Sequence, residues 1–161
     1  MTLAALVSPP GDDPIIVERD FQASPASLFE AWTKPEELKK WFRFGEEPLK
    51  EVTIDLRIGG QWQFSHYSKE GYKETLGGLY EVITPNEKLV FTWRHQRILN
   101  NGETETTGES RVTISLNKND DGVSMRLMHA GILSEDVRNG IGQGWVKLSD
   151  VMGEQIERVA S

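Results

Sequence analysis

Three histidines are the residues of this sequence best suited to acid–base chemistry: His66, His95 and His129. Each stands one step beyond an alternating apolar run and continues its parity, so each faces the same side of a strand as that run. We expect His95 and His66 to project toward the mouth of a cavity, where a neutral imidazole can hydrogen-bond a ligand or move a proton. The alternative is a structural role, at partly exposed strand ends or as hydrogen-bonded core histidines.

Other chemistry has weaker signals. The histidine spacing supplies no zinc-ligand motif, and the chain has no cysteine. It also has no phosphate-binding glycine loop and no nucleophile elbow, so we predict neither a metal nor another cofactor. Arg19 shares the inward parity of its strand and could hold a ligand carboxylate. The alternative is an arginine on the sheet rim, paired with an acid such as Glu18, Asp55 or Glu81.

Large aromatic side chains gather on the predicted inward faces. About half of them must fill a core, and the others could line a pocket of the usual ~300–1,000 Å³. The predicted lining residues are Trp32, Trp41, Phe42, Trp62, Phe64, His66, Tyr80, Phe91, Trp93, His95, Trp145 and Leu148. Gly140, Gly142 and Gly144 precede Trp145, and each costs a helix up to ~1 kcal/mol relative to alanine. Close approach of a ligand or of the sheet, or a helix end that moves as a gate, would account for them.

A long C-terminal helix is the element that must position these side chains. Ser134 can cap its first free amides, and Glu135 and Asp136 suit the positive end of the helix dipole. An apolar stripe then repeats every three or four residues. Its members are Val137, Ile141, Trp145, Leu148, Met152, Ile156 and Val159. The sequence therefore predicts a helix over residues 134–161 that needs a broad apolar surface to lie on.

The preceding chain reads as the sheet that supplies this surface. Residues 15–22 predict a first strand, and Ser24-Pro25 and Pro35 open two short helices. From residue 52 the period changes to two, with about six antiparallel strands joined by tight turns. We predict an α+β fold in which a curved sheet grips the last helix. Residues 1–14 are expected to be a flexible lead, and residues 15–161 a single domain.

Charge and composition limit the partners. A net charge of −7 at pH 7 argues against nucleic acid and anionic membrane surfaces, which both reward lysine and arginine. The N-terminal segment has no basic residue before its short apolar run, so it is a poor signal peptide. The absence of cysteine fits a reducing compartment. We predict a cytoplasmic protein that binds neither nucleic acid nor membrane.

Four motifs in order resemble a known family. They are Arg19–Phe42 with its Ser-Pro and Trp-Phe pairs, Asp55–Phe64 with Gly59-Gly60, Gly78–Trp93, and Gly144-Trp145. Together they are similar to bacterial relatives of the C-terminal domain of the activator of Hsp90 ATPase, within the START/Bet v 1-like (SRPBCC) superfamily. The resemblance implies a helix-grip fold with a cavity between sheet and helix. It does not imply one activity, because the cavity of this superfamily serves several functions.

Three functions follow as expectations. We favour non-covalent binding of a small apolar or aromatic molecule in the cavity. The first alternative is a cyclase- or hydrolase-like enzyme that uses His95, His66 or Tyr80. The second is a stress-response role with a chaperone partner. It is the weaker expectation, because only 14 residues precede the match where the eukaryotic Hsp90 activator carries a large N-terminal domain.

Overall fold

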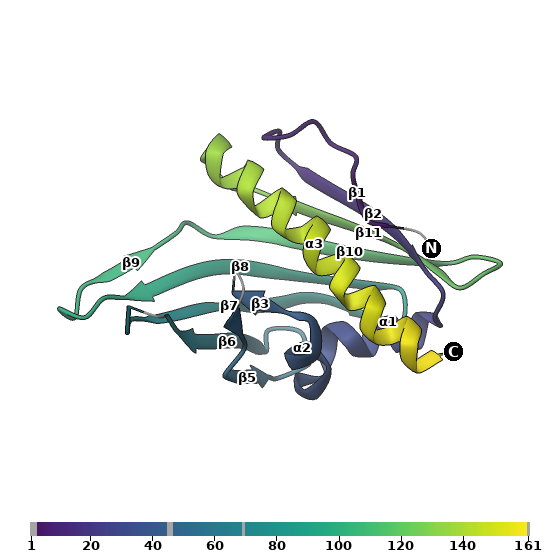
Figure 1. Ribbon diagram of the computed structural model, residues 1–161, viewed down its shortest axis with the longest axis horizontal. Helices are drawn as coiled ribbons and strands as arrows, with labels where there is room; N and C mark the ends of the chain where they lie inside the picture. Colours follow the sequence, from purple (N-terminus) through teal and green to yellow (C-terminus); the bar gives the residue numbers. More distant parts are fainter. Residues whose placement is uncertain (1–2, 45–46, 69, 161) are drawn as a thin grey trace.

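One long helix crosses the concave face of a curved sheet in the computed structural model, which describes residues 3–44, 47–68 and 70–160 (Figure 1). This helix, α3, spans Glu135–Ala160, and the Ser134 hydroxyl accepts a hydrogen bond from the Val137 amide (3.3 Å). The predicted stripe faces the sheet, with Trp145, Met152 and Ile156 buried and Val137 exposed at its start. The side chain of Val159 lies outside the described part. The predicted helix is therefore confirmed.

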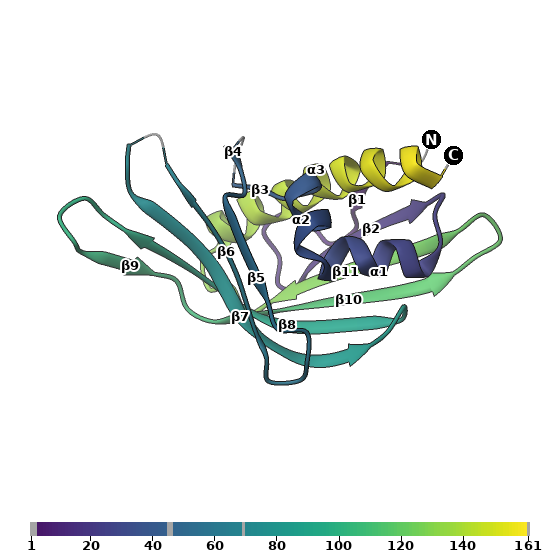
Figure 2. The same ribbon diagram turned by 90° about the horizontal axis from the view of Figure 1, so that it is seen from below.

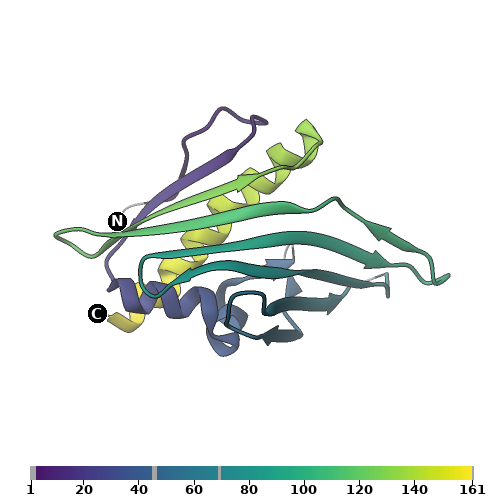
Figure 3. The same ribbon diagram turned by 180° about the vertical axis from the view of Figure 1, so that it is seen from behind.

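The sheet is antiparallel throughout, and nine of its strands lie within the described residues. Its path runs β1, β2, β11, β10, β8, β7, β6, β5, with β9 paired to β8. The bounds are β1 Ala5–Leu6, β2 Ile15–Phe21, β5 Glu51–Ile54, β6 Gln61–Tyr67, β7 Lys73–Thr84, β8 Lys88–Ile98, β9 Thr104–Thr106, β10 Ser110–Lys118 and β11 Val123–Ala130. Figure 2 shows how strongly the sheet curves around α3, and in Figure 3, seen from behind, the strands lie in front of α3. The α+β helix-grip prediction is confirmed.

Two short helices pack beside α3, as predicted. Helix α1 (Pro25–Thr33) is capped by Ser24, whose hydroxyl accepts from the Ser27 amide, and α2 (Pro35–Trp41) begins with its own proline. Proline suits the first helical turn because its missing N–H would be unsatisfied there anyway. Strands β3 (Arg43–Phe44) and β4 (Glu47–Pro48) follow as a small hairpin. These elements close one side of the space between α3 and the sheet.

The N-terminal segment differs from its expectation. Residues 5–6 form β1, which pairs with β2, and Leu6 packs against the core. The Ala4 amide also donates to Asp150 of α3 (2.7 Å). The described part of the predicted lead is therefore packed on the domain. A two-residue strand leaves no periodicity for sequence analysis to find.

Arg19 fixes the C-terminal half of α3 to the sheet. It is 3 % exposed; its Nε lies 3.0 Å from Asp150 Oδ1, and its Nη2 3.2 Å from Glu157 Oε1. Gly153 makes room for it, because a Cβ there would overlap the guanidinium. Arg19 does not line the pocket described below, so the expected ligand contact is not supported. It is paired with acids, as the alternative expected, but it is buried rather than on the rim, and the acids are Asp150 and Glu157 instead of Glu18, Asp55 or Glu81. Sequence parity placed Arg19 inward, but could not show which helix residues would lie above it.

Candidate functional site

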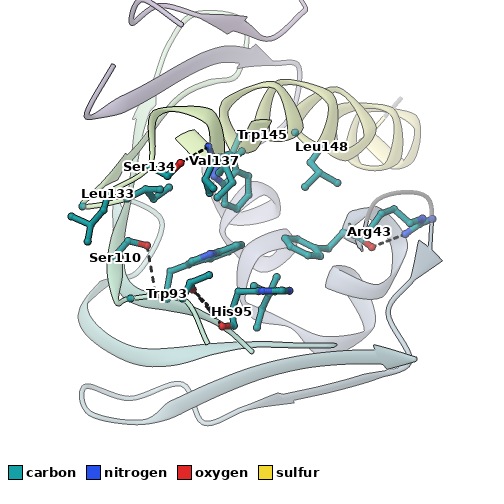
Figure 4. Close-up of a pocket in the computed structure, with 17 residues that line it drawn as sticks. Arg43, Trp93, His95, Ser110, Leu133, Ser134, Val137, Trp145 and Leu148 are labelled. Atoms are coloured by element: carbon teal, nitrogen blue, oxygen red, sulfur yellow. Dashed lines mark hydrogen bonds between the residues drawn. The ribbon is translucent and has the colours of Figure 1, made fainter. Parts of the chain in front are cut away.

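A pocket of about 490 Å³ lies between the N-terminal half of α3 and the sheet (Figure 4). Helix α3 forms one wall, β8 and the start of β10 form another, and the segment before α3 closes the end. The lining residues are Phe42, Arg43, Leu76, Trp93, His95, Thr107, Gly108, Ser110, Gly131, Ile132, Leu133, Ser134, Val137, Ile141, Gly144, Trp145 and Leu148. Most of this surface is apolar, and its size lies within the usual range of small-molecule sites.

Gly144 helps to keep the pocket open. A Cβ built at this position meets no other atom within 4 Å, so the missing side chain leaves free space rather than relieving a clash. Gly140, one turn earlier, is equally unobstructed but does not line the pocket. Neither glycine is required by close contact with the sheet. The missing side chain at Gly144 therefore adds open space to the pocket, whereas Gly140 has no packing explanation.

A chain of hydrogen bonds joins the pocket to the core. The Trp145 indole N–H donates to His129 Nδ1 (3.1 Å), and His129 Nε2 lies 2.7 Å from Ser110 Oγ. An indole nitrogen can only donate, so Nδ1 must be the unprotonated nitrogen of the ring. His129 is fully buried, and desolvation lowers its pKa to about 4. The ring is therefore neutral at pH 7, with its proton on Nε2.

This tautomer decides what Ser110 can do. Since His129 Nε2–H donates to the Ser110 oxygen, His129 cannot accept the hydroxyl proton as a general base would. The arrangement resembles a nucleophile–base pair only in its distance. The Ser110 proton instead points elsewhere, and the Trp93 carbonyl is its protein acceptor at 3.4 Å, a long contact. Ser110 is thus a hydrogen-bond donor at the pocket wall.

A carboxylate lies between the other two histidines. Glu74 Oε2 is 3.0 Å from His95 Nε2, and Glu74 Oε1 is 3.6 Å from His66 Nε2. Of the three histidines, only His95 lines the pocket. His66 is buried and does not line it, contrary to the expectation, and His129 belongs to the Trp145–His129–Ser110 hydrogen bonds described above. In the described ranges, no three histidine, cysteine or acidic side chains are arranged to hold a metal ion.

Arg43 also lines the pocket, and its guanidinium is hydrogen-bonded to backbone. Its guanidinium donates to the carbonyl oxygens of Lys39 (3.2 Å), Phe42 (2.9 Å) and Lys40 (3.3 Å) at the end of α2. Cations near a helix C-terminus satisfy carbonyls that have no partner within the helix. Arg43 therefore acts as a cap, with both terminal nitrogens of its guanidinium bonded to carbonyls at the end of α2.

The structure brings five of the twelve predicted lining residues to the pocket: Phe42, Trp93, His95, Trp145 and Leu148. The other seven lie elsewhere and correct the predicted position of the cavity: Trp32, Trp41, Trp62, Phe64, His66, Tyr80 and Phe91. Between Trp145 and Phe91 the rings fill the space, with Trp62 and Phe91 centroids 5.3 Å apart, leaving a void of about 10 Å³. A void that small holds one water molecule at most. Burial there also raises the pKa of Tyr80 well above its ordinary value, so it is a poor acid or base at pH 7.

Sequence reasoning missed several lining residues. Ser110 begins an inward parity continued by Val112, and this polar residue on an apolar face was a usable signal. Ile132 and Leu133 lie in the connection before α3, where no periodicity marks their direction. Leu133 is 92 % exposed and stands at the pocket mouth.

A curved antiparallel sheet around one long C-terminal helix, with a pocket between them, defines the helix-grip class of START/Bet v 1-like proteins. Within that class, the chain belongs to the family of Activator of Hsp90 ATPase homolog 1-like proteins, whose model matches residues 22–157. None of the curated proteins matches the chain.

Solved structures share the fold at low sequence identity. A protein of Chromobacterium violaceum is 22 % identical, with a TM-score of 0.74 over 91 % of this chain and 99 % of its own. An uncharacterised protein of Rhizobium leguminosarum is 21 % identical, with a TM-score of 0.74 over 98 % and 99 %. CalU16 from Micromonospora echinospora is 22 % identical, with a TM-score of 0.64 over 97 % and 85 %. At these identities the comparison establishes the fold alone.

Proposed function

We propose that the protein binds a small, predominantly apolar molecule non-covalently in the pocket beneath the N-terminal half of α3. The observation that carries this proposal is an apolar space of about 490 Å³ beside a core whose other large aromatics are closely packed. An apolar surface that stays unfilled forgoes the burial that stabilises the remainder of the fold, and a ligand would restore it. No helix in the described residues is long and apolar enough to cross a bilayer. The proposed setting is the cytoplasm, which the cysteine-free sequence fits.

A side chain at Gly144 tests the proposal, because a Cβ there enters free space and the residue lines the pocket. We expect Gly144→Phe to weaken binding of Nile red, an uncharged apolar fluorophore, at least tenfold. Gly140→Phe is the matched control, on the same helix and equally unobstructed but away from the pocket. It should bind Nile red as the unaltered protein does. Equal binding by both variants and the unaltered protein would contradict a site in this pocket.

Acid–base catalysis by His95 is a second candidate, favoured by the 3.0 Å contact of its Nε2 with Glu74 at the pocket wall. A carboxylate that orients an imidazole is a common arrangement for a general base. Hydrolysis of a nitrophenyl ester that His95→Gln abolishes, with Nile red binding retained, would support it. An unchanged rate in that variant would exclude His95.

A further inference from the structure

We propose that the ligand of this pocket is uncharged and carries a carbonyl-type oxygen, which accepts a hydrogen bond from the Ser110 hydroxyl. This inference rests on the proposed function and specifies the chemical class that the same site takes. Two observations carry it: the hydrogen-bonding state of Ser110, and the engagement of Arg43 and His95, along the described pocket wall, by other groups of the protein.

The first observation is that Ser110 is held as a donor. Trp145 fixes the tautomer of His129, and His129 Nε2–H occupies one lone pair of Ser110 Oγ at 2.7 Å. Among the described residues, the hydroxyl proton then has only the Trp93 carbonyl as an acceptor, at 3.4 Å. A ligand oxygen in the pocket at an ordinary distance of about 2.8 Å would be a better acceptor. Ser110, His129 and Trp145 are all buried. The donor direction of the Ser110 hydroxyl is therefore fixed by packed core residues.

The Trp93 indole supplies a second donor. Trp93 lines the pocket and its ring extends into the space below α3 (Figure 4). Its N–H has no hydrogen-bonding partner in the part of the chain that the structure describes. Both Ser110 and Trp93 therefore offer protons to the pocket, and indole has no acceptor to offer in return.

The second observation concerns charge. Arg43 donates to three backbone carbonyls, and His95 is paired with the Glu74 carboxylate. His129 stays neutral at pH 7, and the chain carries a net charge of −7. A ligand carboxylate or phosphate would thus lose its water beside a guanidinium already hydrogen-bonded at the end of α2 and a histidine already paired with Glu74, so its desolvation would be poorly compensated. A ketone, ester or amide oxygen needs only the neutral donors that are present.

Three probes of similar shape separate these possibilities: benzophenone, diphenylmethane and diphenylacetate. The first has the acceptor, the second lacks it, and the third is anionic. Their dissociation constants are measured by calorimetric titration of the intact protein and of Ser110→Ala. We expect Ser110→Ala to weaken benzophenone about 3- to 10-fold relative to diphenylmethane, the effect of one neutral hydrogen bond. We expect diphenylacetate to bind at least tenfold more weakly than benzophenone.

The ratio of two ligands within one variant is insensitive to a general loss of stability, so it isolates the hydrogen bond. Ser110→Thr keeps the hydroxyl and should keep the original ratio. Ser134→Ala is the matched control, because Ser134 also lines the pocket but its hydroxyl caps α3. A ratio that Ser110→Ala leaves unchanged, or tighter binding of diphenylacetate than of benzophenone, would overturn the inference while leaving the pocket proposal intact. Failure of all three probes and of Nile red to bind would overturn the proposed function and this inference with it.

Discussion

The two halves of α3 are attached to the molecule by different means. The C-terminal half carries Asp150 and Glu157, which hold the buried Arg19 of β2, and its one glycine, Gly153, is required by that contact. The N-terminal half carries three glycines and covers the pocket, so much of its inward surface faces free space. The same amphipathic pattern therefore anchors the helix at one end and covers the pocket at the other.

Removing the anchor should have the largest effect. Arg19→Met leaves two carboxylates without their buried partner, and we expect a loss of about 3 kcal/mol in the free energy of unfolding. Gly153→Ala should cause part of the same loss of stability, because the added Cβ on α3 would displace the Arg19 guanidinium. Urea denaturation measures both. The control is Arg126→Met, since the Arg126–Glu18 pair is exposed and 3.8 Å long, and should contribute little. Similar losses for Arg19→Met and Arg126→Met would show that the C-terminal half is not anchored by this pair.

The junction of the two halves should be sensitive to pH through His129. Its folded pKa of about 4 lies below the ordinary value of 6.5, because burial disfavours the charged ring while Asp13 opposes this slightly. The unfolded chain therefore binds a proton first as pH falls. The stabilising contribution is complete above about pH 6.5 and is lost progressively toward pH 4. Between pH 7 and 4.5 we expect a loss of about 2 kcal/mol from this group.

The variant His129→Gln isolates that loss, since it removes the titrating ring but leaves the carboxylates in place. Glu81, whose pKa is lowered by Arg111, titrates in both proteins and cancels from the comparison. Urea denaturation at several pH values should show a slope between pH 6.5 and 4.5 that is shallower in His129→Gln. Identical slopes would mean that His129 is not buried as a neutral ring.

Hydrogen exchange should distinguish the two halves of α3 in the unaltered protein. Amides over residues 138–145 have glycine-rich backbone and a pocket beneath them, so we expect their hydrogen exchange to be at least tenfold faster than over residues 147–156. A bound ligand should slow the first group and leave the second unchanged. Uniform protection along the helix would contradict the contrast and the idea that this end moves as a gate.

The sequence predicted the local patterns of α3 and the strands, but not which of their side chains surround the pocket. The stripe from Val137 to Ile156 and the alternation of the strands are local periodicities, so the fold and the inward faces were predictable. Which inward side chains are packed and which surround a pocket depends on the curvature of the sheet. Trp62 and Trp93 share the alternating pattern, yet one lies in the filled core and the other at the pocket. The contacts Arg19–Glu157 and His129–Trp145 join distant segments, and residue type alone does not select them.

Alanine at the glycines of the N-terminal half gives the smallest effect and the most direct test of the division. Because a Cβ at Gly140 meets no atom within 4 Å, Gly140→Ala should stabilise the protein by up to ~1 kcal/mol through helix propensity and a less flexible unfolded chain. Gly144→Ala should do the same, since a single methyl group occupies little of the pocket. Gly153→Ala, the same change on the same helix, should have the opposite sign. If thermal unfolding showed Gly140→Ala to be destabilising, the glycines would be serving a contact in the N-terminal half, and the two ends of α3 would be held alike.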